Sequence, residues 1–150
     1  MPGDIDFMRL ALAQAQRAQL AGEVPVGAVL VAGDEVIAGG ANRPIATHDP
    51  TAHAEIEALR SGGAALGSYR LTDTTLYVTL EPCPMCAMAI VHARVRRLVF
   101  GAWDPRAGAA GSVTDIFALA GLNHRVDVFG GVLMEECGSL LREFFAARRG

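Results

Sequence analysis

The alternation of apolar and polar positions predicts helices and strands that follow one another along the chain. Apolar residues recur at helical spacing over residues 7–22, where a glycine ends the predicted helix. The next segment favours a hairpin, with strands at residues 26–31 and 35–38 around a Gly-Asp-Glu turn. A short helix is expected over residues 51–62, with Thr51 as its cap and a glycine as its stop.

The second half of the chain continues this alternation. Strands are expected at residues 75–80 and 97–102, with a weaker one at residues 126–130. A helix over residues 83–94 opens with prolines, which the first turn of a helix tolerates. The closing amphipathic helix carries an apolar stripe of Leu133, Cys137, Leu140, Leu141, Phe144 and Phe145. Helices interleaved with strands predict a sheet covered on both faces, an α/β sandwich.

Length and composition restrict the class of protein. A chain of 150 residues predicts one domain, spanning residues 1–150. The apolar fraction is 51%, which favours burial of some surface against another subunit. No run approaches the ~18 apolar residues of a membrane span. The acidic first segment is unlike a signal peptide, and three cysteines suit a reducing compartment, so a cytoplasmic location is expected.

Charge is distributed unevenly along the chain. The formal net charge is −3, which by itself argues against a nucleic-acid partner. Residues 1–93 hold 5 Arg and 10 acids, whereas residues 94–150 hold 8 Arg and 6 acids. All 13 basic residues are Arg, whose planar guanidinium suits phosphate oxygens. Two clusters can be interpreted either as phosphate contacts or as solvated ends of elements: Arg94, Arg96 and Arg97, and the pair Arg148 and Arg149.

Two short motifs carry the candidate chemistry. His53 and Glu55 lie near the start of one predicted helix, and Cys83 and Cys86 lie one turn apart at the start of another. Helix N-termini lower a thiol pKa. Two thiolates and one imidazole make a three-ligand zinc set, with the fourth position left for a water whose pKa falls to about 7. Glu55 is then placed to move protons.

Each motif has a simpler interpretation. A C-x-x-C pair can be a redox couple, a metal ligand pair or chance, His53 can be a cap, and Glu55 can be a first-turn acid. Together, H-x-E followed by P-C-x-x-C is the signature of zinc deaminases that act on nucleobases. A zinc hydrolase is therefore favoured over a non-catalytic zinc-stabilised binding module and over a thiol oxidoreductase, because these alternatives leave Glu55 unexplained.

Longer segments identify a family by resemblance. The stretches "NRPIATHDPTAHAEIEALR", "LYVTLEPCPMCAMAIVHARVRRLVFGAWD", "GAAGS" and "LNHRV" resemble the bacterial tRNA-specific adenosine deaminases, within the cytidine-deaminase-like zinc deaminase superfamily. The resemblance runs over residues 9–149. It implies a three-layer α/β/α sandwich with a five-stranded mixed sheet, assembled as a homodimer with one zinc ion per subunit. It also implies hydrolysis of adenosine to inosine at the wobble position of a tRNA anticodon stem-loop, with a zinc-bound hydroxide as nucleophile.

The resemblance also assigns residue roles. His53, Cys83 and Cys86 match the zinc ligands of the family, and Glu55 matches its proton shuttle. Residues that match substrate contacts are Asn42, which would bind the nucleoside, Asp104, which would contact the anticodon backbone, and Phe145, Arg148 and Arg149 of the last helix.

One residue departs from the family pattern, and one rival shares the fold. Glu57 stands where an apolar or neutral residue is expected, four residues after His53, and we expect it to be solvated. The rival is a deaminase of a free base or nucleoside such as cytosine, guanine or cytidine. Such an enzyme closes over a small ligand and does not need the arginine-bearing terminal helix.

Overall fold

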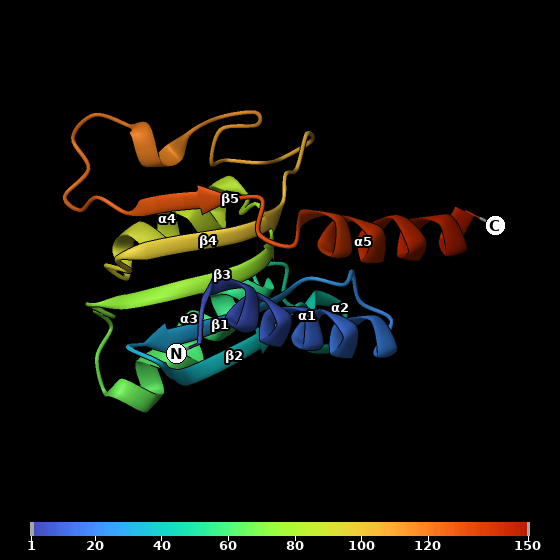
Figure 1. The fold of residues 1–150 in the computed structure, drawn as a ribbon, viewed down its shortest axis with the longest axis horizontal. Helices are drawn as coiled ribbons and strands as arrows, with labels where there is room; N and C mark the ends of the chain where they lie inside the picture. Colours follow the sequence, from blue (N-terminus) through green and yellow to red (C-terminus); the bar gives the residue numbers. More distant parts are fainter. Residues whose placement is uncertain (1, 150) are drawn as a thin grey trace.

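The computed structural model describes residues 2–149, in which five strands form one sheet in the order β2-β1-β3-β4-β5 (Figure 1). The strands are β1 (Gly27–Ala32), β2 (Glu35–Ala41), β3 (Thr74–Leu80), β4 (Arg97–Ala102) and β5 (Asp127–Gly130). The helices are α1 (Asp4–Leu20), α2 (Pro44–Thr47), α3 (Ala54–Leu66), α4 (Pro84–His92), the 3₁₀ turn η1 (Ile116–Ala118) and α5 (Met134–Arg149).

The sheet is mixed, and its parallel part determines where the candidate residues lie. β1 pairs antiparallel with β2 and β3, whereas β3, β4 and β5 are parallel neighbours. The carboxyl ends of these three strands therefore meet at one edge of the sheet, where ligands of open α/β sheets usually bind. Cys83 follows β3 and Asp104 follows β4, so both lie at this edge.

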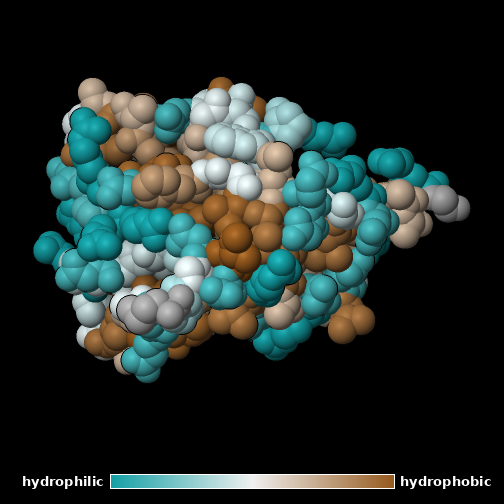
Figure 2. All heavy atoms as spheres, viewed as in Figure 1, coloured by the Kyte–Doolittle hydropathy of each residue, from teal (hydrophilic) through white to brown (hydrophobic). Residues whose placement is uncertain are grey.

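Helices cover both faces of the sheet, which confirms the three-layer α/β/α sandwich with a five-stranded mixed sheet (Figure 1). Successive strand residues point to opposite faces, so Leu30 packs in the core beneath α3 and α4, and its neighbour Val29 packs beneath α1 and α5. Figure 1 shows α1 and α5 running side by side past the end of the sheet. In the same view, Figure 2 shows an apolar area at the centre of this face, bordered by hydrophilic side chains.

The expected limits of α3 are wrong at both ends. The N-cap position is His53 and the helix begins at Ala54, because the Thr51 N–H and hydroxyl both donate to Asp49 Oδ1, at 2.9 and 2.7 Å. The helix also continues through Gly62 and ends at Leu66, followed by the C-cap Gly67 in a left-handed conformation. A side chain at position 62 would collide with Leu30, so this glycine permits close packing and does not stop the helix.

Other elements differ from expectation in smaller ways. The second strand extends to Ala41, three residues further than its apolar pattern indicated. Of the stripe expected in the last helix, Cys137 and Phe144 are buried, Leu133, Leu140 and Leu141 are half-buried, and Phe145 is 44% exposed. Among the described residues, no helix combines the length and the apolar character that a bilayer span requires.

Candidate metal centre and its surroundings

Three donor atoms from two helix starts lie close together at the edge of the sheet. Nδ1 of His53 is 3.4 Å from Sγ of Cys86 and 3.6 Å from Sγ of Cys83, and all three atoms lie within 4.8 Å of one another. Tetrahedral zinc, with Zn–S of about 2.3 Å and Zn–N of about 2.0 Å, separates nitrogen and sulfur ligands by about 3.5 Å. The donor set therefore fits zinc in both kind and spacing, with a fourth position left over.

The local folds explain why these atoms meet. His53 and Cys83 occupy the N-cap positions of α3 and α4, where the backbone is extended, and Pro84 begins α4. Cys86 lies one turn into α4 and is buried. Both helices thus direct their first turn, with its exposed N–H groups and positive dipole end, towards the same place.

The electrostatics of the three side chains favour a bound cation. A hydrogen bond with Cys86 lowers the pKa of Cys83 to about 4, and the same bond, together with burial, raises the pKa of Cys86. A hydrogen bond with Cys83 raises the pKa of His53. A divalent cation bound between the two sulfur atoms would replace this hydrogen bond and stabilise both thiolates.

Glu55 is a buried acid next to these donors. Its side chain is 4% exposed, and burial, with the neighbouring charge of Cys83 also contributing, raises its pKa to about 7. A hydrogen bond with Cys86 acts in the opposite direction. A carboxyl group in this position can take up and release a proton beside a bound water or substrate.

The segment between β2 and α3 holds both Asn42 and His53. Asn42 follows β2 directly, is half-buried, and donates its backbone N–H to the Val26 carbonyl at 3.0 Å. The Arg43 N–H donates to the Ala52 carbonyl at 3.0 Å, which ties the residue after Asn42 to the residue before His53. Asn42 and His53 therefore belong to one hydrogen-bonded segment.

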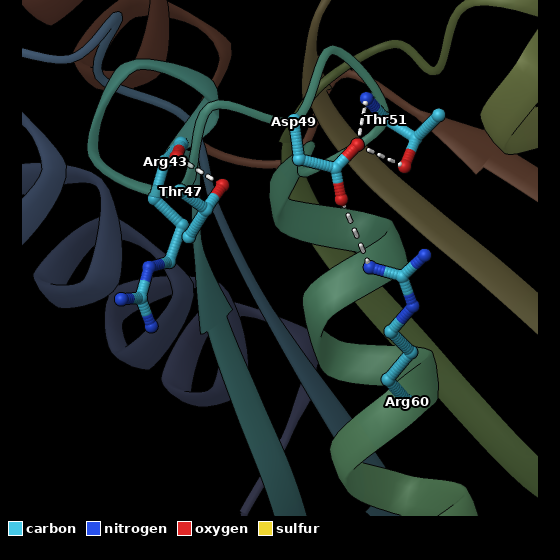
Figure 3. Close-up of polar contacts among 5 residues, drawn as sticks. All are labelled: Arg43, Thr47, Asp49, Thr51 and Arg60. Atoms are coloured by element: carbon cyan, nitrogen blue, oxygen red, sulfur yellow. Dashed lines mark hydrogen bonds and ion pairs between the residues drawn. The ribbon is translucent and has the colours of Figure 1, made fainter.

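Figure 3 shows four further polar contacts that fix this segment. Asp49 accepts hydrogen bonds from Thr51 through Oδ1, and its Oδ2 lies 3.6 Å from Nη1 of Arg60 on α3 (Figure 3). The Thr47 hydroxyl donates to the Arg43 carbonyl at 2.9 Å. The turn before His53 is thus attached to the helix that His53 begins.

The buried acid Glu23, which the sequence did not indicate, binds the backbone of the same segment. Glu23 is 2% exposed, and its carboxylate accepts the backbone N–H groups of Ile45 at 3.1 Å and Ala46 at 2.8 Å. These are free N–H groups of the first turn of α2, a four-residue helix too short to be predicted from periodicity. The "EVP" sequence around Glu23 gave no signal for this role.

A second missed acid, Glu81, organises the loop after β4. It is 2% exposed and accepts the N–H groups of Asp104 at 2.9 Å, Ala110 at 2.9 Å and Ser112 at 3.1 Å, as well as the Ser112 hydroxyl. Burial raises the pKa of Glu81, but these hydrogen bonds outweigh it and lower the pKa overall. The one feature of the sequence that pointed to a role for Glu81 is its position directly before Pro82 and Cys83.

Asp104 is held within this loop by its side chain as well as by its backbone. Its Oδ1 accepts the N–H groups of Arg106 at 2.9 Å and Ala107 at 3.3 Å, which forms a local turn. The structure places Asp104 at the same sheet edge as the metal centre. Arg106, two residues on, is exposed.

The last helix lies beside α1, with which it lines a shallow groove. Arg148 donates to the Gly22 carbonyl at 2.7 Å, and its guanidinium lies 4.3 Å from the centre of the Phe144 ring. Phe145 and Arg149 are exposed. The structure therefore brings Phe145, Arg148 and Arg149 together on one helix, where Arg148 is exposed but bound to the Gly22 carbonyl.

Glu57 is less solvated than expected. Its N–H donates to the His53 carbonyl at 3.0 Å, and its side chain is half-buried, with Cβ close to the backbone of Gly40. Within residues 2–149 the carboxylate has no cation within 4 Å.

Comparison with known proteins places these features in one family. The model of the cytidine and deoxycytidylate deaminase zinc-binding region matches residues 1–102. The tRNA-specific adenosine deaminase of Haemophilus influenzae is 53% identical over 147 residues, covering 97% of this chain and 85% of that protein. The tRNA-specific adenosine deaminase of Bacillus subtilis is 45% identical over 149 residues, covering 99% and 92%.

Solved structures agree with the sequence relatives. A structure from studies of A-to-I editing by tRNA:A34 deaminases at the wobble position of transfer RNA has a TM-score of 0.88 and 48% identity, covering 90% of this chain and 98% of that one. A guanine deaminase from Nitrosomonas europaea has a TM-score of 0.84 and 27% identity, covering 97% and 86%. The fold is thus shared with a free-base deaminase, whereas the higher identity is to the tRNA deaminases.

Proposed function

The chain belongs to the zinc-binding cytidine and deoxycytidylate deaminase family, and we propose that it hydrolyses adenosine to inosine at the wobble position of a tRNA anticodon. The observation that carries this proposal is the group of His53, Cys83 and Cys86 donor atoms beside the buried Glu55. Identity of 45–53% to tRNA-specific adenosine deaminases supports the substrate. We assign the whole of residues 1–150 to this one catalytic domain.

His53, Cys83 and Cys86 would hold one zinc ion per subunit. Zinc bound there supplies the nucleophile, because it lowers the pKa of a water molecule to about 7. Glu55 takes the proton of that water and delivers it to N1 of adenine as the oxygen adds to C6. Glu55 then carries the proton of the new C6 hydroxyl to the exocyclic amine, so that the C6 carbonyl forms as ammonia leaves, and water and adenosine give inosine and ammonia.

The reacting base must leave its stack to reach Glu55. An anticodon loop presents bases that are already partly unstacked, which reduces a cost of a few kcal/mol. We propose that the Asn42 side chain binds the nucleoside, because its backbone is fixed beside the residues that lead to His53. Asp104 would contact the backbone of the flipped nucleotides from the loop that Glu81 organises.

Exposed arginines around this edge explain how a chain of net charge −3 can bind RNA. Arg43 is the residue after Asn42, and Arg106 lies two residues after Asp104. Within residues 2–149 neither arginine has a carboxylate within 4 Å. Phosphates are suitable partners for such guanidinium groups. Phe145, Arg148 and Arg149 would extend this surface along α5, with Arg149 the more available of the two arginines because Arg148 is bound to Gly22.

We propose that the chain acts as a homodimer in the cytoplasm. A groove between α3 and α4 supports the dimer, because it is lined mainly by apolar side chains, including Ile56, Leu59 and Ala89. Sedimentation analysis at several protein concentrations tests this part, and a monomer at every concentration contradicts it.

Deamination of an anticodon stem-loop tests the function. The zinc-loaded protein is incubated with a stem-loop that carries adenosine at the wobble position, and inosine is read as an A-to-G change after reverse transcription. A stem-loop with adenosine one position away is the matched control. Conversion of the wobble adenosine alone is expected. Ammonia released from guanine, cytosine or cytidine, with the RNA unchanged, would overturn the proposal in favour of a free-base or nucleoside deaminase.

A further inference from the structure

Trp103 is a large exposed aromatic residue at the same edge of the sheet as the metal centre. It is the one tryptophan of the chain, and 47% of it is exposed. It directly follows Ala102, which pairs with Leu80 and accepts the N–H of Glu81 at 2.8 Å. Because Cys83 is two residues past Glu81, the indole lies on the strand end next to the one that leads into the metal site.

The indole is held in place although half of it faces solvent. Its ring and that of Phe100 meet edge to face, with centroids 4.7 Å apart and planes at 89°. A Cβ at Gly130 would lie 2.9 Å from the indole, so the absence of a side chain there allows the ring to pack against β5. The next residue, Asp104, is fixed through its N–H by Glu81. An aromatic group ordered before binding loses little entropy when it stacks on a partner.

The surroundings of Trp103 indicate which partner it would stack on. Asp104 and the exposed Arg106 follow it in the loop. The Arg106 guanidinium suits a phosphate, and the Asp104 carboxylate can accept a hydrogen bond from a ribose hydroxyl. Sequence-specific proteins recognise RNA loops through unstacked bases laid on aromatic side chains. A deaminase that extracts one base from such a loop leaves the neighbouring bases without a stacking partner.

We propose that Trp103 stacks on an unpaired base adjacent to the wobble adenosine and so determines the affinity for the RNA loop. This inference rests on the proposed function. Trp103 is a substrate-binding residue in this role and takes no part in proton transfer. Stacking is tolerant of base identity, so Trp103 favours an open loop over duplex RNA without selecting one flanking sequence.

The single tryptophan allows a direct measurement. The zinc-loaded protein is titrated with a stem-loop that carries inosine at the wobble position, so that no turnover occurs. Indole emission and the anisotropy of a fluorescent label on the RNA are followed together. Quenching of the indole with the same midpoint as the anisotropy change is expected. Binding seen by anisotropy with unchanged indole emission would overturn the inference.

Kinetics on the adenosine stem-loop give the second test. Trp103→Leu should raise KM about tenfold with little change in kcat, since loss of one stacked base weakens binding by roughly 5- to 150-fold. Trp103→Phe should recover most of the affinity. Phe129→Leu is the matched control, because this ring is 49% exposed but packs on Arg97 at the beginning of β4, so its KM should be unchanged.

The outcomes separate this inference from the function on which it rests. An unchanged KM in Trp103→Leu, or a fall in kcat alone, overturns the stacking role while leaving the deaminase function intact. A KM for Trp103→Phe as high as that for Trp103→Leu also overturns the stacking role. A wild-type protein that deaminates no stem-loop refutes the proposed function, and the inference falls with it.

Discussion

The backbone N–H of Asp104 donates to the carboxylate of Glu81 across 2.9 Å, so the loop after β4 is attached to the residue two before Cys83. The same carboxylate accepts N–H groups from Ala110 and Ser112. Buried backbone donors need such partners, because water does not reach them. One acid therefore orders the whole loop against the strand end that leads to the metal site.

Replacing Glu81 by Gln should loosen this loop. Gln keeps one acceptor oxygen but brings an NH2 group towards backbone donors, which leaves a buried N–H without a partner at a cost of about 1–3 kcal/mol. We expect a lower free energy of unfolding by denaturant and a higher KM for the stem-loop. Ser112→Ala, which removes the hydroxyl but not the N–H, should show a smaller change in the same direction. Equal stability of Glu81→Gln and the wild type would contradict this account.

Loss of one proposed ligand should remove the metal and destabilise the fold. Cys83→Ala leaves two donor atoms, and zinc then no longer links the starts of α3 and α4. Elemental analysis should show little zinc, and the Tm should fall. Cys137→Ala is the control, because this third cysteine is a buried residue of α5 and lies outside the donor group. The Cys137→Ala variant should be less stable, because the smaller side chain leaves a cavity, but it should keep its zinc. Full zinc content in Cys83→Ala would refute the ligand assignment.

Glu55→Gln should keep zinc and lose turnover. The amide has the shape of the carboxyl group but cannot accept and return protons, and general acid–base catalysis contributes about 10²- to 10⁴-fold. We expect kcat on the stem-loop to fall by at least about 100-fold with zinc content unchanged. The pairing of two measurements is essential here, since a fall in kcat with loss of zinc would indicate a structural role for Glu55. Substantial turnover by a zinc-loaded variant would refute the proton shuttle.

The strands and the donor group were predictable from sequence because their signals are local. Val29 and Leu30 lie in a continuous β-rich run, and the H-x-E and P-C-x-x-C spacings place donor atoms at helix starts whatever the rest of the chain does. Glu23 and Glu81 were not predictable, because each accepts N–H groups from residues more than 20 positions away. The sequence alone does not show whether an acidic side chain will be hydrogen-bonded by water or by a buried backbone N–H.

The start of α3 shows the same limit at short range. Thr51 is a good capping residue, and Asp49 two positions earlier is an equally good acceptor for its N–H and hydroxyl. Capping propensity does not decide whether Thr51 caps the helix or donates to Asp49. The ion pair of Asp49 with Arg60 stabilises the turn, and the helix then begins after His53.

The Asp4–Arg97 ion pair should make stability depend on pH in acid. Arg97 Nη2 lies 3.0 Å from Asp4 Oδ2, and this hydrogen bond, aided by one from the Tyr77 hydroxyl, lowers the pKa of Asp4 below its ordinary 3.8 despite partial burial. The pair thus stabilises the fold above about pH 4, and the contribution disappears as pH falls through the lowered pKa. Because both side chains are partly exposed, Asp4→Asn should cost less than about 1 kcal/mol at pH 7.

Denaturant unfolding at several pH values measures this difference. Asp4→Asn and the wild type should differ by a constant amount above about pH 5 and converge below pH 3.8. Asp34→Asn is a suitable control, because this turn residue is exposed and has no ion pair among residues 2–149. A gap between Asp4→Asn and the wild type that widens in acid would contradict the lowered pKa.

Gly40→Ala should displace the start of α3 and so disturb the metal centre. A Cβ at this position in β2 would lie 2.3 Å from the Ala54 carbonyl oxygen and 2.6 Å from the Ala58 N, both backbone atoms of α3. The first turn of the helix would have to move, and His53 with it. Overpacking of this kind costs about 1–3 kcal/mol, so we expect lower stability and weaker zinc retention against a chelator. Gly138→Ala meets only the mobile end of Arg142 on α5 and should be neutral or more stable by up to about 1 kcal/mol. If Gly40→Ala retained zinc as well as Gly138→Ala, then the contact between β2 and the first turn of α3 would not be what positions His53.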